Sequence, residues 1–201
     1  MRARVAGTAI LFAAIVIASC DSARVGVRTY NGIRIRTPVL KPQVTLERVD
    51  GSPYNIEQET SDRVTLLYFG YTHCPDVCPT QLMSVARAFR ILGADTTSRM
   101  RLLFVTLDPT RDTGALLQSW LHGFHPEFVP LRASSQAVDY ELRRLHLASP
   151  DEPSGGVPNP AHASAIVVFG RDGMSHFLYS ASTNAEAWAY DLRQLLRDST
   201  P

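Results

Sequence analysis

A nearly continuous run of apolar residues, 64–70, leads directly into two cysteines, Cys74 and Cys78, and then into an amphipathic segment. The run is β-branched, aliphatic and aromatic, which is typical of a central strand that is buried on both faces. Such a strand needs helices on both sides of its sheet. After the cysteines, apolar residues recur at intervals of three and four up to Gly93. We therefore expect a helix over residues 79–92, with Pro79 near its first turn.

The same patterns place further elements along the chain. We expect a second interior strand over 102–107 beside the first, followed by a helix through Leu121 that Asp112 or Thr113 caps. A short strand near 128–131 and a helix from Ser134 or Ser135 to Leu145 come next. We expect a third interior strand over 165–169 that turns back into a strand over 176–179, and a final helix that begins at the capping-box spacing of Thr183 and Glu186 and reaches Leu196. Residues 150–160 are rich in Pro, Gly and Ser and indicate an exposed loop. Strands that alternate with helices predict an α/β fold, and a strand that leads into a cysteine pair at a helix start predicts a thioredoxin-like mixed sheet flanked by helices.

The N-terminus resembles an export signal. Residues 1–19 combine Arg2 and Arg4 with an apolar stretch too short for a comfortable membrane span. The sequence Ile-Ala-Ser-Cys at 17–20 resembles the lipobox of bacterial lipoproteins, so we expect Cys20 to be the lipidated first residue. An uncleaved anchor helix and an ordinary signal peptide are the alternatives. Asp21 resembles a signal for retention in the inner membrane, which predicts a lipid-anchored protein at the periplasmic face of that membrane.

The remaining 182 residues are enough for one domain. Residues 20–43 contain scattered arginines, glycines and prolines without a sustained period, so we expect a membrane tether that leads into a first short strand or hairpin. We expect the domain over residues 44–199. Without Arg2 and Arg4 the chain carries 18 Lys+Arg against 19 Asp+Glu. This near-neutral balance provides no basic field for nucleic acid, and we expect none to bind.

Cys74 and Cys78 are the only cysteines besides Cys20. If Cys78 lies in the first turn of the predicted helix, both sulfurs face the helix N-terminus, whose partial charge and unpaired N–H groups favour thiolate. We therefore predict a lowered pKa for the thiols. Their three intervening residues, rather than the two that most dithiol oxidoreductases use, suit a pair that holds a metal or closes a disulfide after local backbone movement. A structural disulfide is the remaining alternative.

His162 lies directly before the third predicted interior strand. In a thioredoxin-like sheet, the loop before that strand commonly approaches the cysteines. Two thiolates and one imidazole form a soft site that is suited to copper(I), and a site with similar donors can hold copper(II). Zinc competes because it also accepts sulfur and nitrogen, but a structural zinc site needs four ligands. His73 is the nearby candidate for a fourth.

Two stretches, 68–80 and 104–112, read YFGYTHCPDVCPT and FVTLDPTRD. They resemble the Sco/SenC family of copper chaperones, and the resemblance extends over roughly residues 40–197. It implies a thioredoxin-like domain tethered to the inner membrane. It further implies copper binding through Cys74, Cys78 and His162, followed by delivery to the binuclear centre of the copper-bearing subunit of cytochrome c oxidase, or reduction of that centre's cysteines.

The resemblance also extends to residues around the expected ligands. Asp108 matches a family feature, so we expect Asp108, like His73, to support the metal ligands or to contact a partner. The other interpretation of Asp108 is a turn residue at the end of a strand. A second periplasmic copper carrier or a thiol reductase is a further expected partner.

Two functions remain open at this point. The first is a copper chaperone, which is not an enzyme. The second is a thiol-disulfide reductase in which Cys74 and Cys78 are catalytic, one attacking a partner's disulfide and the other resolving it. A peroxide-reducing relative of peroxiredoxins needs Thr or Ser and Arg around its reactive cysteine, and Thr72 and Arg111 support that class only weakly.

Overall fold

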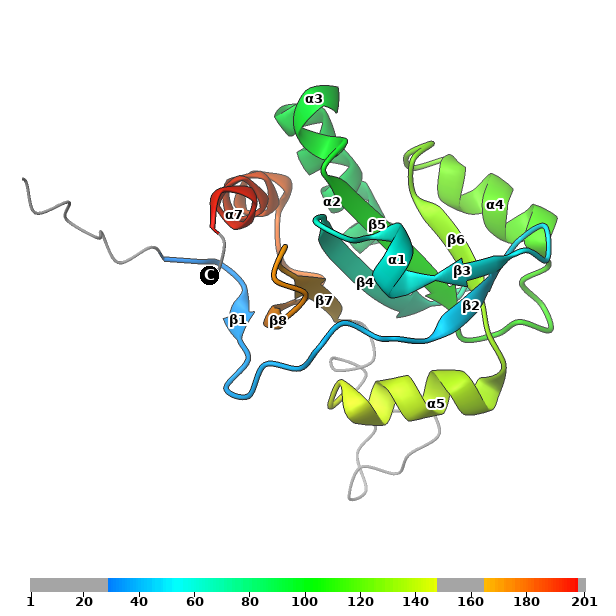
Figure 1. Ribbon diagram of the computed structural model, residues 1–201. Coiled ribbons are helices and arrows are strands. Elements are labelled where there is room, and N and C mark those ends of the chain that lie inside the picture. The colour runs from blue at the N-terminus through cyan, green and yellow to red at the C-terminus, as the bar shows by residue number, and fades with distance from the viewer. Residues whose placement is uncertain (1–28, 148–164, 199–201) are drawn as a thin grey trace, which may run out of the picture.

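An eight-stranded mixed sheet forms the centre of the computed structural model, which describes residues 29–147 and 165–198 (Figure 1). The strand order is β1-β8-β7-β4-β5-β6-β2-β3, in which β4, β5 and β6 are parallel and the other pairs are antiparallel. The strands are β1 (Ile33–Arg34), β2 (Thr45–Arg48), β3 (Pro53–Asn55), β4 (Val64–Gly70), β5 (Met100–Thr106), β6 (Val129–Arg132), β7 (Ile166–Phe169) and β8 (Ser175–Tyr179). The helices are α1 (Ile56–Glu59), α2 (Val77–Leu92), α3 (Ala94–Thr97), α4 (Gly114–His122), α5 (Ser135–Arg144) and α7 (Ala185–Arg197).

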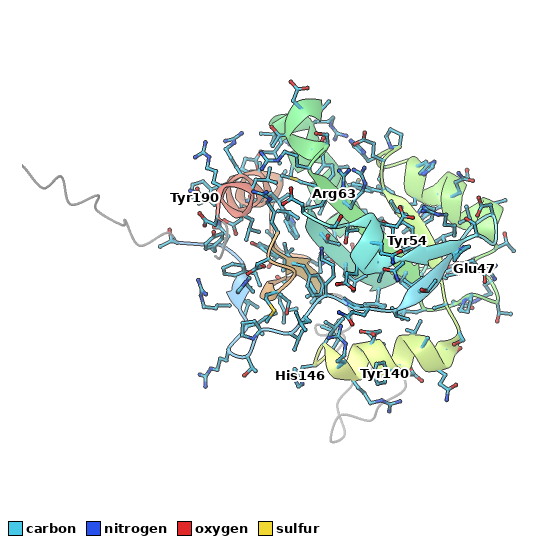
Figure 2. The ribbon with its side chains drawn as sticks, in the orientation of Figure 1. Glu47, Tyr54, Arg63, Tyr140, His146 and Tyr190 are labelled. Atoms are coloured by element: carbon cyan, nitrogen blue, oxygen red, sulfur yellow. The ribbon has the colours of Figure 1, made fainter. Side chains whose placement is uncertain are left out.

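Helices cover both faces of the sheet, because the side chains of the central strand alternate between two hydrophobic clusters. Leu66 and Tyr68 of β4 pack with residues of α2, α4 and α7, whereas Leu67 and Phe69 pack with residues of α5. All seven residues of β4 are buried. Figure 2 shows the exposed Tyr190 of α7 and Tyr140 of α5 on opposite sides of the molecule. The predicted α/β fold, a mixed sheet flanked by helices, is confirmed.

The two interior strands β4 and β5 end at the same edge of the sheet. They pair in parallel from Val64 opposite Met100 to Gly70 opposite Thr106, and the amide of Leu107 donates to the carbonyl of Gly70 at 2.7 Å. The predicted neighbour relation of these strands is confirmed. The loops that carry their polar residues therefore begin side by side.

Helix caps agree with the sequence in three cases and differ in one. Thr113 caps α4, Ser134 caps α5, and Gly93, with φ at 80°, ends α2. The final helix, α7, begins at Ala185, one residue later than a cap at Thr183 would place it. Asn184 is the cap instead, because its side-chain oxygen accepts a hydrogen bond from the amide of Ala187 at 2.8 Å. Thr183 is held in the preceding turn, where its amide donates to Ser180. The predicted cap at Thr183 is therefore wrong. The start of α2 also differs from the prediction: the helix begins at Val77, two residues before the predicted Pro79.

Several predicted features lie outside the described residues: the signal at 1–19, Cys20, and the loop at 150–160. Within the described part, no helix combines the length and apolar character that a membrane span requires. The predicted tether is described only from residue 29 onward. There, β1 pairs with β8, and the amides of Asn31 and Gly32 donate to the carboxylate of Asp191 at 2.7 and 3.1 Å.

Lys41, the only lysine of the chain, fixes the end of this N-terminal segment. Its side chain is buried, and Nζ donates to the carbonyl of Thr60 at 3.0 Å. Burial lowers the pKa of Lys41 from 10.5 to about 8, although the nearby carboxylates of Asp172 and Glu57 oppose this shift. The amine is therefore held in a place that disfavours its charged form.

This burial predicts a pH-dependent stability. Between pH 8 and pH 10.5 the unfolded chain keeps a proton on Lys41 that the folded chain has lost, so the free energy of unfolding rises with pH in this window. Lys41→Met removes that contribution. Urea unfolding at the two pH limits measures the effect: the wild type should gain more stability toward high pH than the variant. An equal pH dependence in both proteins would contradict the prediction.

Candidate metal and redox centre

Cys74 and Cys78 lie at the junction of β4 and α2. Cys74 is in the loop after Gly70, where its amide donates to the carbonyl of Tyr71 at 3.2 Å. Cys78 is the second residue of α2. The buried strand and the amphipathic helix thus bring both cysteines to one helix start, as their spacing in the sequence predicts. Both thiols are free.

The sulfur of Cys74 takes the place of a helix cap. Asp76 precedes α2, but its side chain makes no capping hydrogen bond. Instead the amide of Cys78 donates to Cys74 Sγ at 3.4 Å. Burial alone would raise the pKa of the Cys74 thiol, but hydrogen bonds from Cys78 and from the amides of Asp76 and Val77 outweigh it and lower the pKa. Cys74 is therefore the thiol that deprotonates more readily, and its side chain is partly exposed.

Cys78 has the opposite character. It is 4% exposed and belongs to the hydrophobic cluster beneath α2. Burial raises the pKa of its thiol to about 11, although the Tyr68 hydroxyl and the Tyr71 backbone oppose the shift. The predicted lowering of the pKa holds for Cys74 and is wrong for Cys78, because this sulfur points into the core, where the loss of water outweighs the favourable helix terminus.

Gly70 creates the space that the Cys78 sulfur occupies. A Cβ atom at this position would lie 3.0 Å from Cys78 Sγ and 2.9 Å from the ring of Phe104. Both contacts are shorter than ordinary van der Waals separations. Glycine at the end of β4 therefore lets the sulfur pack against the strand.

The buried carboxylate of Asp112 holds the cysteine loop against the neighbouring loop. Asp112 is 0% exposed and accepts hydrogen bonds from the Thr72 amide at 3.1 Å, the Thr72 hydroxyl at 2.5 Å and the Thr106 hydroxyl at 2.6 Å. Sequence reasoning considered this residue only as a helix cap. The signal that was missed is a pair of threonines at or just past the ends of two adjacent parallel strands, with a carboxylate within reach of both.

This network also orients the ring of His73. Nδ1 lies 3.1 Å from the Thr72 hydroxyl and 3.8 Å from Asp112 Oδ1. Since the Thr72 hydroxyl donates to Asp112, it accepts from Nδ1–H, and in the neutral ring Nε2 carries the lone pair. The side chain is 55% exposed. His73 thus lies beside the cysteine pair, and its role toward a metal or a partner stays a prediction.

Asp108 is engaged within its own turn. Its carboxylate accepts hydrogen bonds from the side chain of Arg111 and, at 3.2 Å, from the Arg111 amide. The hydrogen bond from the Arg111 side chain lowers the pKa of Asp108. The Asp108 amide donates to the Thr106 hydroxyl at 3.0 Å, which links this turn to the Asp112 network. Asp108 therefore organises the turn after β5, and its contact with a partner stays a prediction.

His162, the predicted third ligand, lies outside the described residues. Across residues 29–147 and 165–198, no group of three His, Cys, Asp or Glu side chains could hold a metal ion. The described part of the site therefore supplies two sulfur donors. This is a soft donor pair, one member of which is accessible from solvent.

Comparisons with known proteins place this arrangement in context. The SCO1/SenC family model matches residues 40–197. The bovine mitochondrial protein SCO2 homolog is 36% identical over 126 residues, which cover 60% of this chain and 47% of that protein. The solution structure of apo Sco1 from Thermus thermophilus is 32% identical with a TM-score of 0.66 and covers 85% of this chain and 99% of that one.

A structure of ScoI from Bradyrhizobium japonicum with copper bound is 25% identical with a TM-score of 0.65. It covers 78% of this chain and 99% of that one. The matched segments span between 47% and 65% of the length of the first curated relatives. The mixed sheet with its flanking helices is thus the thioredoxin-like fold of these solved Sco structures.

The Asp112 network predicts a specific loss on substitution. In Asp112→Asn an NH₂ group meets the donors of Thr72 or Thr106, so we expect the free energy of unfolding to fall by about 1–3 kcal/mol and the Thr72 amide to exchange faster with solvent. Urea unfolding and hydrogen exchange measure both effects. Asp95→Asn, at an exposed position of α3, is the control and should change stability by less than about 0.5 kcal/mol. Equal behaviour of the two variants would contradict the role of Asp112.

Proposed function

Because this chain belongs to the SCO1/SenC family, we propose that it is a copper chaperone, which binds copper through Cys74, Cys78 and His162 and delivers it to the binuclear copper site of cytochrome c oxidase. The observation that carries the proposal is the pair of thiols at the start of α2, inside the segment that the family model matches. The oxidase as recipient rests on the family resemblance. The copper-bearing subunit of the oxidase is then the main partner, with a second periplasmic copper carrier or a thiol reductase as another.

The proposal extends to the place where the chain works. Residues 1–19 are the signal, Cys20 carries the lipid anchor, and the membrane tether predicted over 20–43 leads into the copper-binding domain predicted over 44–199. Because Asn31 and β1 are already joined to the folded domain, the part of this segment that can act as a tether precedes residue 31. The site then faces the periplasm from the outer side of the inner membrane. This compartment permits disulfides, so the state of the cysteine pair responds to the surrounding thiols as well as to copper.

The donor set suits copper as cargo. Thiolates are soft ligands that select copper(I), and an imidazole nitrogen completes a three-coordinate site. The two sulfurs differ in access: Cys74 is partly exposed, whereas Cys78 is buried. A recipient can therefore exchange its own ligands for Cys74 first, while Cys78 still holds the ion. Such stepwise exchange keeps the copper bound throughout the transfer.

The topology supports the inclusion of His162. Strand β7 pairs antiparallel with β4, and Ile166 lies opposite Tyr68. The chain therefore enters β7 at the same edge of the sheet where β4 leads into the cysteine loop. His162 lies four positions before Ile166 in the sequence. An extended chain of that length spans about 14 Å, which is enough to reach across one neighbouring strand toward the sulfurs.

A second function is favoured by the difference between the two thiols. The lowered pKa of Cys74 suits a nucleophile, and the buried Cys78 suits a resolving thiol. As a reductase, Cys74 thiolate would attack a partner's disulfide, forming a mixed disulfide and releasing one partner thiolate. Cys78 would then lose its proton and attack Cys74, which releases the second partner thiolate and leaves a Cys74–Cys78 disulfide. The partner gains two electrons, and a thiol reductase must return two to the pair.

Copper titration tests the proposed chaperone. The reduced protein should bind one copper ion per chain, and His162→Ala should weaken binding by more than about tenfold, because a lost ligand costs more than a lost outer-shell contact. The affinity is measured with copper(I) against a chromophoric competitor, and the spectrum with copper(II). His146→Ala, just after α5 (Figure 2), is the control and should bind as the wild type does. Absence of stoichiometric binding, or an unchanged His162→Ala, would end the proposal.

Trapping of a mixed disulfide tests the reductase. With the oxidised copper-bearing domain of the oxidase as target, Cys78→Ser should accumulate a mixed disulfide through Cys74, because the resolving thiol is missing. Cys74→Ser should accumulate little, because the remaining sulfur is buried. Electrophoresis without reductant measures the adduct. Accumulation mainly in Cys74→Ser would reverse the assigned roles, and none in either variant would count against reduction.

A further inference from the structure

The hydroxyl of Tyr68 is a buried hydrogen-bond donor that makes no hydrogen bond among the described residues. Tyr68 is 0% exposed, and its oxygen has no hydrogen-bond partner among the described residues. A buried polar group in this state destabilises the fold, and such groups are rare in native proteins. Each of them therefore needs an explanation, and this one lies at the candidate site.

The Cys78 sulfur is the candidate acceptor for this hydroxyl. Tyr68 packs edge-on against Phe104, with ring centroids 5.4 Å apart, inside the hydrophobic cluster beneath α2. Cys78 belongs to the same cluster, and its sulfur lies 3.0 Å from the position of a Cβ at Gly70, on the face of β4 that also carries Tyr68. The Tyr68 hydroxyl is close enough to this sulfur to influence the pKa of the Cys78 thiol, although the two groups do not meet the geometry of a hydrogen bond. The backbone of Tyr68 is fixed between two strands, opposite Phe104 on β5 and Ile166 on β7. The side chain therefore starts from a fixed backbone position inside the core.

We propose that Tyr68 is a positioning residue for the metal-loaded site: its hydroxyl donates a hydrogen bond to the Cys78 sulfur when that sulfur is a metal-bound thiolate. This inference rests on the proposed copper binding. A neutral thiol is a weak acceptor, whereas hydrogen bonds to charged groups are about twice as strong as neutral ones. The bond thus forms in the loaded state and is missing in the empty one.

The consequence is a preference of the buried sulfur for the loaded state. Cys78 is removed from water, so no solvent donor stabilises negative charge on it. The Tyr68 hydroxyl replaces that solvent, and it is already in place before the ion arrives. The free-energy cost of the unpaired hydroxyl is present in the empty site and absent in the loaded one. This difference in free energy adds to the affinity for the ion.

Tyr68→Phe separates this role from a purely structural one, because it removes a single oxygen and keeps the ring. The empty protein should unfold at an unchanged or higher urea concentration, since an unpaired buried hydroxyl is lost. Copper(I) affinity should fall about tenfold, which corresponds to the loss of one hydrogen bond to a charged group. The sulfur-to-copper(II) absorption band should move to longer wavelength, because a sulfur without a hydrogen bond gives up electron density more easily.

Tyr54→Phe is the matched control. Tyr54 is also buried, at 2% exposure, but it lies on β3 in the other hydrophobic cluster, at the far side of the sheet (Figure 2). This variant should keep the copper affinity and the absorption band of the wild type. A loss of copper affinity as large as in Tyr68→Phe would show that any buried hydroxyl has this effect and would overturn the inference.

Cadmium(II), a second soft ion that binds thiolates, keeps the inference distinct from the proposed function. If the wild type bound cadmium(II) but no copper, the chaperone function would fail, and the affinity ratio of wild type to Tyr68→Phe for cadmium(II) would still decide the role of Tyr68. Wild-type affinity of Tyr68→Phe for the ion that binds would overturn the inference. The inference would also be overturned if Tyr68→Phe lowered the free energy of unfolding of the empty protein by as much as it lowered the free energy of ion binding.

Discussion

The buried carboxylate of Asp112 is the interaction on which the geometry of the site depends. It joins the loop after β4 to the turn after β5 through the hydroxyls of Thr72 and Thr106 and the amide of Thr72. A buried charge is tolerated only where hydrogen bonds replace its hydration, and three donors do so here. Because Thr72 is held at two atoms, His73 and Cys74 continue from a fixed point. The parallel register that sets Gly70 opposite Thr106 brings these donors together.

From that fixed point, burial gives the two cysteines different chemistry. Cys74 receives amide hydrogen bonds at the start of α2, whereas Cys78, four residues on, points into the cluster beneath the helix. A metal that binds both sulfurs must displace a proton from each, and the buried thiol gives up its proton less readily. The environment of Cys78 therefore decides how strongly the pair is loaded. Gly70 and Tyr68, both of β4, form that environment.

The sequence is informative where periodicity and burial coincide. The fully buried β4, the amphipathic α2 and the β7–β8 hairpin follow from apolar patterns and turn residues, because those patterns report directly on packing. Patterns fail where pairing or tertiary contact decides. Strand β1 has two exposed residues and exists only through its pairing with β8. Likewise, Asn184 rather than Thr183 caps α7, and Asp112 bonds to a residue forty positions away. The raised pKa of Cys78 reflects depth in the core, which spacing does not encode.

The N-terminal segment is attached at a distance from this chemistry, and the sheet order explains why. Asp191 of α7 accepts hydrogen bonds from the amides of Asn31 and Gly32, from the Asn31 side chain, and from the Tyr179 hydroxyl. Strand β1, which follows at once, is separated from β4 by β8 and β7. At a spacing of about 4.8 Å per strand, roughly 14 Å of sheet lies between the attached segment and the strand that carries the cysteines. A pull on the chain at residue 29 would therefore meet the hydrogen bond from the Tyr30 hydroxyl to Asp198 first and the Asp191 hydrogen bonds next. If the chain is tethered to a membrane as proposed, the domain can therefore move relative to its anchor while the two sulfurs keep their geometry.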